Sequence, residues 1–161
     1  MSVADTFRVT TPSDTELAMI REFDAPRRLV WRTLVEPPLI QRWMGQMPGW
    51  SWAECSVDLR VGGKYRYKWN GPDGVVMGMG GVYSEISPPD RIVATELFDD
   101  PWYPGGAVVT TTLVESQGRT TLTLTVKYAS REARDGVLQS GATGGVESGF
   151  ELLAEMLKTL K

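Results

Sequence analysis

Acid–base chemistry in this protein would depend on carboxylates and phenols, because its 161 residues include no histidine. A Ser-His-Asp or Cys-His nucleophile relay, a histidine-ligated zinc and an imidazole general base are therefore excluded within the chain. The remaining candidates are Glu96 and the hydroxyls of Tyr65, Tyr67 and Tyr83. Burial would disfavour the charged form of Glu96 and raise its pKa, which would suit it to act as a base.

Three other groups of residues resemble chemical sites but have simpler explanations. The Gly-Met-Gly-Gly run at 78–81 lies within a predicted strand and precedes no helix, so a bulge or close backbone approach is favoured over a phosphate-binding turn. Asp99 and Asp100 have no further spaced ligands and indicate a loop surface. Glu54 and Asp58 would lie about 13 Å apart along a strand, too far to act on one atom. We expect no metal and no cofactor.

The charge balance argues against nucleic acid as a partner. The chain has 17 Lys and Arg against 20 Asp and Glu, a net charge of −3, with the charges spread along it. The basic cluster Arg27, Arg28 and Arg32 is best explained as a solvated helix face. No apolar run approaches the roughly 20 residues of a membrane span, and the first residues lack a secretion signal. Cys55, the one cysteine, predicts an inert buried thiol. We expect a cytoplasmic protein that binds no membrane.

The elements that must position Glu96 and the tyrosines follow from periodicity. Residues 16–23 alternate as a strand, and Asp24 and Pro26 then favour the start of a short helix at 27–35. A second short helix is expected at 39–44. Alternating segments separated by turns predict further strands at 51–59, 64–69, 75–86, 91–98, 107–115 and 120–128.

The last thirty residues return to helical spacing. Apolar residues recur at intervals of three and four from Leu138 to Leu160, and Ser130 can cap the first turn. Several glycines interrupt this stripe, so we expect a break near 141–145.

This order of elements predicts an α+β fold. A curved antiparallel sheet of six to seven strands would wrap round the long C-terminal helix, with two short helices after the first strand. Incomplete closure between helix and sheet would leave an apolar cavity. We expect residues 1–14 to form an N-terminal lead and residues 15–161 a single domain.

Six short motifs occur in one order along the chain. They are FDAP with VW at 23–31, LIQRW at 39–43, DLRVGG at 58–63, GPDG at 71–74, GVY at 81–83 and ISPPDRIV at 86–93. In this respect the chain resembles the Activator of Hsp90 ATPase homologue 1-like (AHSA1-like) family of the START/Bet v 1-like superfamily, also called the SRPBCC or polyketide cyclase group. The resemblance implies a helix-grip fold with a deep hydrophobic cavity and, in many stand-alone bacterial members, no assigned activity. The chain departs from the family at 140–145, where relatives carry larger residues.

Strand and helix periods predict which side chains face the cavity. The opposite register would bury Lys64, Arg66 and Lys68. For the strand aromatics, filling a dry core is an equal alternative, and for Phe150 and Leu153 core filling is favoured. Val75 is a further candidate for the concave face of its strand. The predicted ligand-binding residues are Trp43, Met44, Met47, Trp50, Tyr65, Tyr67, Trp69, Met77, Met79, Tyr83, Glu96, Phe98, Trp102, Val146, Phe150 and Leu153.

Three functions remain open. The favoured one is binding of a small apolar or aromatic molecule, because the candidates are mostly apolar and no reactive constellation is visible. The second is a cyclase or dehydratase, a lyase or isomerase without metal or nucleotide, in which cavity shape assists Glu96 and the tyrosines. The third is chaperone interaction, although the activators that name the family resemble this chain only in their terminal domain. A homodimer is compatible with each.

Overall fold

Residues 6–160, which the computed structural model describes, form one antiparallel sheet of eight strands and four α-helices. The strands lie in the order β1-β2-β8-β7-β6-β5-β4-β3, and a short 3-10 turn at Pro72–Gly74 connects β4 and β5. The strands are β1 Arg8–Ser13, β2 Glu16–Phe23, β3 Ser51–Val57, β4 Lys64–Asn70, β5 Val76–Ser87, β6 Arg91–Phe98, β7 Ala107–Ser116 and β8 Arg119–Tyr128. The helices are α1 Arg27–Val35, α2 Pro37–Trp43, α3 Arg131–Gln139 and α4 Ala142–Leu157.

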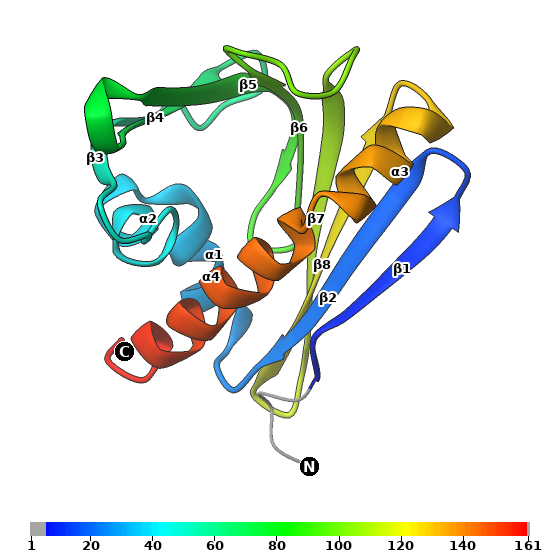
Figure 1. Cartoon of the computed structure of the whole chain (residues 1–161). Helices are drawn as coiled ribbons and strands as arrows, with labels where there is room; N and C mark the ends of the chain where they lie inside the picture. The colour runs from blue at the N-terminus through cyan, green and yellow to red at the C-terminus, as the bar shows by residue number, and fades with distance from the viewer. Residues whose placement is uncertain (1–5, 161) are drawn as a thin grey trace.

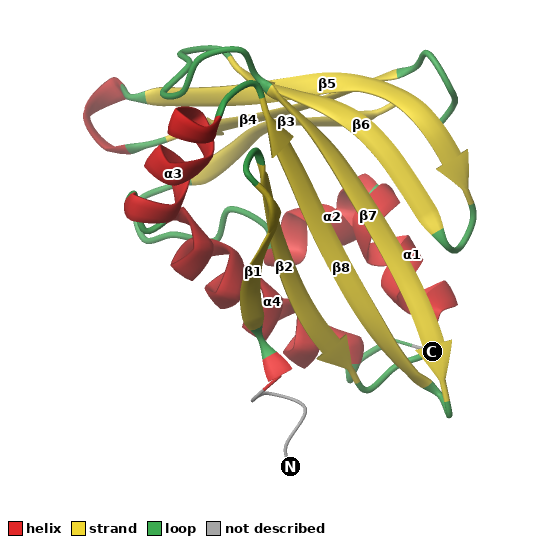
Figure 2. Ribbon diagram, turned by 90° about the vertical axis from the view of Figure 1, so that its right-hand side faces the viewer, coloured by secondary structure: helices red, strands yellow, loops and turns green. Residues whose placement is uncertain are grey.

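The sheet curves around α4, and all four helices lie on its concave side (Figures 1 and 2). Phe150 of α4 is the meeting point of three elements. Its ring packs edge-to-face on Phe23 of β2, with centroids 5.7 Å apart, and lies 6.1 Å from the ring of Trp43 at the end of α2. The C-terminal half of α4 thus packs in the hydrophobic core, while its N-terminal half lies nearer to α3.

A buried arginine also ties α4 to the sheet. Arg21 of β2 is 1% exposed, and its Nη1 lies 2.7 Å from Oε1 of Glu151 on α4. The guanidinium stands 5.2 Å from the centroid of the Phe23 ring, and Nε donates to the carbonyl of Glu22. The ion pair therefore joins β2 directly to the C-terminal half of α4.

The helix-grip α+β fold is confirmed, with eight strands in place of the six or seven predicted. The additional strand is β1, which lies within the expected N-terminal lead. All six of its residues are exposed, so no apolar alternation marks it in the sequence. Pairing with β2, in which Arg8 lies opposite Ile20 and Val9 opposite Met19, holds β1 in the sheet.

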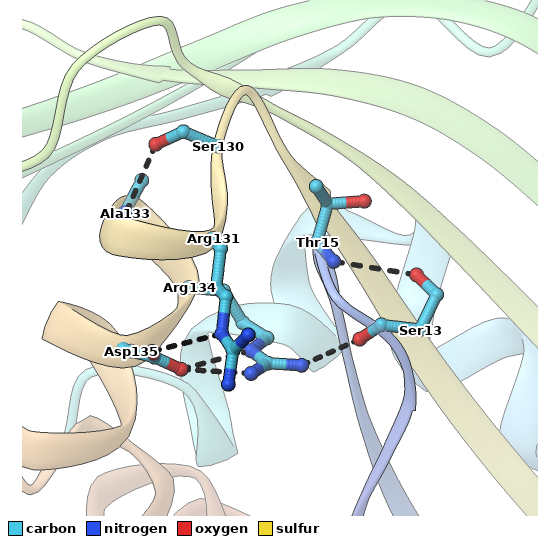
Figure 3. Close-up of polar contacts among 7 residues, drawn as sticks. All are labelled: Ser13, Thr15, Ser130, Arg131, Ala133, Arg134 and Asp135. Atoms are coloured by element: carbon cyan, nitrogen blue, oxygen red, sulfur yellow. Dashed lines mark hydrogen bonds and ion pairs between the residues drawn. The ribbon is translucent and has the colours of Figure 1, made fainter.

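Arg134 of α3 fastens that helix to the turn between β1 and β2 (Figure 3). Its side chain is 8% exposed and donates hydrogen bonds to the carbonyl oxygen of Ser13 and to Asp135. At the start of α3, Ser130 accepts a hydrogen bond of 3.1 Å from the backbone N–H of Ala133, which confirms the predicted cap. These contacts hold α3 over one end of the sheet.

Two details of the helix ends differ from expectation. Asp24 does not cap α1, because the N-cap position is Pro26 and no side chain bonds the first turn. The second helix begins at Pro37 rather than at 39, since a proline fits the first helical turn. The predicted break in the terminal helix is confirmed at Gly141, whose φ of 85° separates α3 from α4.

Candidate functional site

A cavity of about 690 Å³ lies between the N-terminal half of α4 and the concave face of the sheet. Its wall draws on β2, β4 to β8, the segment after α2, the loop between β6 and β7, and both α3 and α4. This volume lies within the range of roughly 300–1,000 Å³ typical of sites for small molecules. Most of the lining is aliphatic or aromatic, with a few polar groups among it.

Twelve of the predicted ligand-binding residues lie in this wall. They come from the end of α2 and the segment after it, from β4, β5 and β6, from the loop between β6 and β7, and from α4. They are Trp43, Met44, Met47, Tyr65, Tyr67, Met79, Tyr83, Glu96, Phe98, Trp102, Val146 and Phe150.

Two predicted tryptophans pack outside the cavity. The indole of Trp69 stacks against Trp52, with ring centroids 4.7 Å apart, and lies under Gly45. A Cβ at Gly45 would stand 2.3 Å from Trp69 Nε1, so this glycine, at φ +70°, makes room for the ring. Trp50 packs against Gly71, where an added Cβ would lie 2.8 Å from the indole. Both rings therefore pack near β3 and β4, and neither lines the cavity.

Three further candidates also fall outside the wall. Met77 pairs with Trp69 across β4 and β5, one side-chain position beyond Met79, and so lies past the end of the cavity. Leu153 is 0% exposed and belongs to the hydrophobic core, in agreement with core filling, the interpretation that the sequence favoured for it. Val75 is 52% exposed, because it precedes β5 in the connecting turn.

The opposite wall of the cavity was missing from the sequence prediction. The sequence showed the alternation of β8 but not its pairing with β2. In the structure Leu17 lies opposite Val126, and Met19 lies opposite Leu124. Tyr103 lies in a loop and had no periodic signal. The main additions are Leu17, Met19, Ile92, Ala94, Tyr103, Val109, Thr111, Leu122, Leu124, Val126, Tyr128 and Val137, with residues 142–145 of α4.

Glu96 brings a carboxyl group to the cavity wall. Tyr103 Oη donates a hydrogen bond of 3.0 Å to Glu96 Oε1. Burial raises the pKa of Glu96, and the hydrogen bond from Tyr103 opposes that rise by stabilising the carboxylate. A carboxyl group with a raised pKa can take up and release a proton nearer to neutral pH than an ordinary glutamate can.

Of the three tyrosines that the sequence indicated as candidates, Tyr65 lies near Glu96. Tyr65, which donates a 2.7 Å hydrogen bond to the carbonyl of Thr95, is joined there by Tyr103 and Tyr128. Burial, and then the charge of Glu96, raise the pKa of Tyr65, Tyr103 and Tyr128. At neutral pH these phenols are therefore hydrogen-bond donors and acceptors, not bases.

Tyr67 and Tyr83 extend the aromatic wall away from Glu96. Their rings lie 5.1 Å and 5.6 Å from that of Tyr65, measured between centroids. Burial raises the pKa of Tyr67 well above its ordinary value and that of Tyr83 to about 12. These two residues supply apolar surface and neutral hydroxyls to the cavity.

A second, smaller cavity of about 420 Å³ borders the same glutamate. Glu96 and Tyr128 line both cavities, and the wall of the smaller one also includes Gly105, Gly106 and Lys127. It forms where β6 and β7 part, just beyond the last pair of that ladder, Glu96 and Ala107. Glu96 thus stands between two hollow regions of the protein.

The other predicted sites are accounted for by structural contacts. Asp99 forms an ion pair with Arg66, whose hydrogen bond lowers the pKa of that carboxyl group. A Cβ at Gly81 would lie 1.8 Å from the carbonyl oxygen of Thr95, which confirms close backbone approach in the glycine run. Burial raises the pKa of Cys55 to about 11, so its thiol stays protonated. Within residues 6–160, no three metal-ligating side chains gather and no helix could cross a membrane.

Known structures and one family resemble this chain. The family model of the Activator of Hsp90 ATPase homolog 1-like protein matches residues 24–159. A Rhodobacter sphaeroides protein is 33% identical, with a TM-score of 0.87 over 96% of this chain and 99% of its own. Proteins of Nitrosomonas europaea (28% identity, TM-score 0.80, 94% and 100% covered) and Mycobacterium smegmatis (26%, 0.80, 93% and 95%) are also similar. No curated protein matches the chain.

Proposed function

The chain belongs to the Activator of Hsp90 ATPase homolog 1-like family, and from that premise we propose that its cavity binds a small, predominantly apolar molecule. The observation that carries the proposal is the cavity of about 690 Å³, walled mainly by aliphatic and aromatic side chains. Packed cores contain few voids larger than a water molecule, and an unfilled hollow of this size lowers the stability of the fold, so a ligand that fills it would stabilise the protein.

The composition of the wall favours an apolar ligand with one or two polar groups. Methionines such as Met19 and Met79 adapt to irregular shapes, and tyrosines offer a large apolar face with one hydroxyl each. Three phenols, those of Tyr65, Tyr103 and Tyr128, lie near the carboxyl group of Glu96, and this polar group of residues would orient the polar end of a bound molecule.

Tryptophan fluorescence tests this proposal, because Trp43 and Trp102 lie in the cavity wall. Neutral apolar probes, such as long-chain alcohols and polycyclic aromatics, should change the emission saturably. Native mass spectrometry of freshly purified protein should in addition report the mass of any retained ligand. Absence of saturable binding across the panel would count against a binding function.

A pair of matched variants separates cavity binding from surface adsorption. Leu124→Trp would place a large ring in the cavity, because Leu124 lines it from β8, and should abolish probe binding. Val114→Trp makes the same kind of change on the exposed face of β7, where Val114 is 63% exposed. This control should bind like the wild type, and equal binding by both variants would contradict a site in the cavity.

A second candidate function is acid–base catalysis by Glu96 on a molecule held in the cavity. The specific observation in its favour is the half-buried position of Glu96 in the apolar wall, where partial desolvation raises its pKa. A carboxylate in such a place could remove a proton next to a carbonyl group, as cyclisation and dehydration of a ketone require.

Proton exchange gives a direct test of this second function. The wild type should accelerate the exchange of the α-hydrogens of an apolar ketone, such as β-tetralone, with deuterium from solvent, as followed by NMR. Glu96→Gln keeps the shape of the side chain but removes the base, so it should lose the acceleration. Equal exchange rates with both proteins would reject a catalytic role for Glu96.

A further inference from the structure

We propose that the cavity prefers ligands that carry a protonated amine on an apolar body, with the carboxylate of Glu96 as the counter-ion. This inference deepens the proposed binding function and rests on it. It concerns the charge of the ligand, which neither the fold nor the family specifies.

Among the described residues of the cavity wall, Glu96 is the one acidic or basic side chain. No lysine or arginine lines that cavity. The other polar groups there are neutral phenols, hydroxyls and one amide, including Gln46, Thr111, Thr143 and Ser148. An anionic ligand would therefore meet a carboxylate and no compensating cation, which costs free energy in a site of low dielectric constant.

The carboxylate of Glu96 is also short of partners. Tyr103 donates to Oε1, and no residue of 6–160 is seen to donate to Oε2. Lys127 borders the smaller cavity together with Glu96, yet the two form no ion pair within 4 Å among the described contacts. Glu96 is half-buried, and a partly desolvated carboxylate without a counter-ion is destabilised relative to one that is paired. A ligand ammonium at Oε2 would remove that deficit.

Aromatic rings gather around Tyr103, the hydrogen-bond partner of Glu96. Tyr103, bonded to Glu96, packs edge-to-face with Phe98, Trp102 and Tyr128 at centroid separations of 6.1, 5.0 and 5.1 Å. The face of an aromatic ring attracts a cation that lies within about 6 Å of its centroid. A carboxylate with adjoining aromatic rings therefore offers an ammonium both a hydrogen-bonded partner and favourable ring contacts.

The N-terminal turn of α4 is the feature that would favour the opposite charge. Residues 142–145 line the cavity, and helix N-termini attract anions. Two of its backbone N–H groups already have partners: that of Ala142 donates to Ser140 Oγ at 3.2 Å, and that of Gly144 to the carbonyl of Gly141 at 3.1 Å. The turn also bears no basic side chain that would hold an anion. The charged group of the cavity is thus negative.

Calorimetric titration with three probes that share one apolar chain tests the inference. At neutral pH, decylamine is cationic, decanol neutral and decanoate anionic. Because a hydrogen bond to a charged group is stronger than one between neutral groups, decylamine should bind the wild type at least roughly tenfold more tightly than decanol. Decanoate should bind more weakly than either.

Variants locate the source of the preference. Glu96→Gln should abolish the preference, so that this variant binds decylamine no more tightly than it binds decanol. Glu147→Gln makes the same change of charge on the exposed face of α4, away from the cavity wall, and should keep the preference. Circular dichroism and thermal unfolding check that each variant is folded.

The outcomes separate this inference from the binding function on which it rests. If decanol binds as tightly as decylamine, or if Glu96→Gln keeps the amine preference, the cavity binds ligands but Glu96 does not select them. A preference for decanoate would place the ligand's charged group at the start of α4 and overturn the inference. If none of the three probes binds, both the inference and the proposed function fail.

Discussion

Replacement of Gly145 by alanine should stabilise this protein, although the residue lies at the edge of the cavity. Gly145 is in the first half of α4, and a Cβ built on it meets no atom within 4 Å. Alanine in a helix is more favourable than glycine by roughly 0.5–1 kcal/mol, because glycine loses more backbone entropy on folding. For a chain of this size that gain corresponds to a rise of about 1–4 °C in Tm.

Two other glycines provide the controls. Gly136 lies inside α3, where an added Cβ also meets nothing within 4 Å, so Gly136→Ala should stabilise by a similar amount without touching the cavity wall. Gly141 has the same open space but a φ of +85°. Alanine there must adopt the left-handed conformation, which costs about 1–2 kcal/mol. Gly141→Ala should therefore lower the free energy of unfolding.

Urea unfolding followed by tryptophan fluorescence measures all three variants under one set of conditions. The expected order of stability places Gly136→Ala and Gly145→Ala above the wild type and Gly141→Ala below it. The reasoning is refuted if Gly145→Ala destabilises the protein while Gly136→Ala stabilises it, since the space around Gly145 would then not be free. It also fails if Gly141→Ala is as stable as Gly136→Ala, since backbone conformation would then not decide the effect.

Three further predictions concern the buried charges. Tyr103→Phe should raise the pKa of Glu96 further, because it removes the hydrogen bond to the carboxylate; a ¹³C-detected NMR titration would show this, and an unchanged pKa would contradict it. Stability should fall as pH rises from 4.5, the ordinary value, through the raised native pKa of Glu96, because the folded protein binds more protons than the unfolded chain in that interval. Glu96→Gln should reduce this slope in plots of Tm against pH, and an identical slope would assign it to other groups. Glu151→Gln should lower the free energy of unfolding in urea by about 1–2 kcal/mol, because buried Arg21 would lose its ionic partner. The loss should be smaller than for a fully buried pair, since Glu151 is half exposed. An unchanged free energy of unfolding would show that water compensates Arg21.

Local patterns in the sequence predicted most of the elements. Strand β6 coincides with the predicted segment 91–98, and α1 with 27–35, because each buries one face and its apolar residues repeat with the period of that element. Gly141 marks the break between the last two helices because glycine readily adopts a positive φ. The same alternation directed Tyr65, Tyr67 and much of the cavity wall inward.

Strand order and loop placement required the tertiary structure. β1 is exposed along its whole length, so only its pairing with β2 reveals it. Met77 and Met79 share one strand face and have the same local pattern, yet only Met79 reaches the cavity, because the position of the cavity along the strand depends on where the helices lie.

The sequence by itself determined that this protein has no histidine chemistry, and that Glu96 on its strand is the carboxyl group to examine. Only the tertiary structure decided which groups surround that carboxyl group. Tyr103 comes from an irregular loop and Tyr128 from the end of β8, two strands away from β6 in the sheet. The physical reason is that periodicity reports which side of an element is buried, whereas the neighbours of a buried side chain depend on contacts between distant segments.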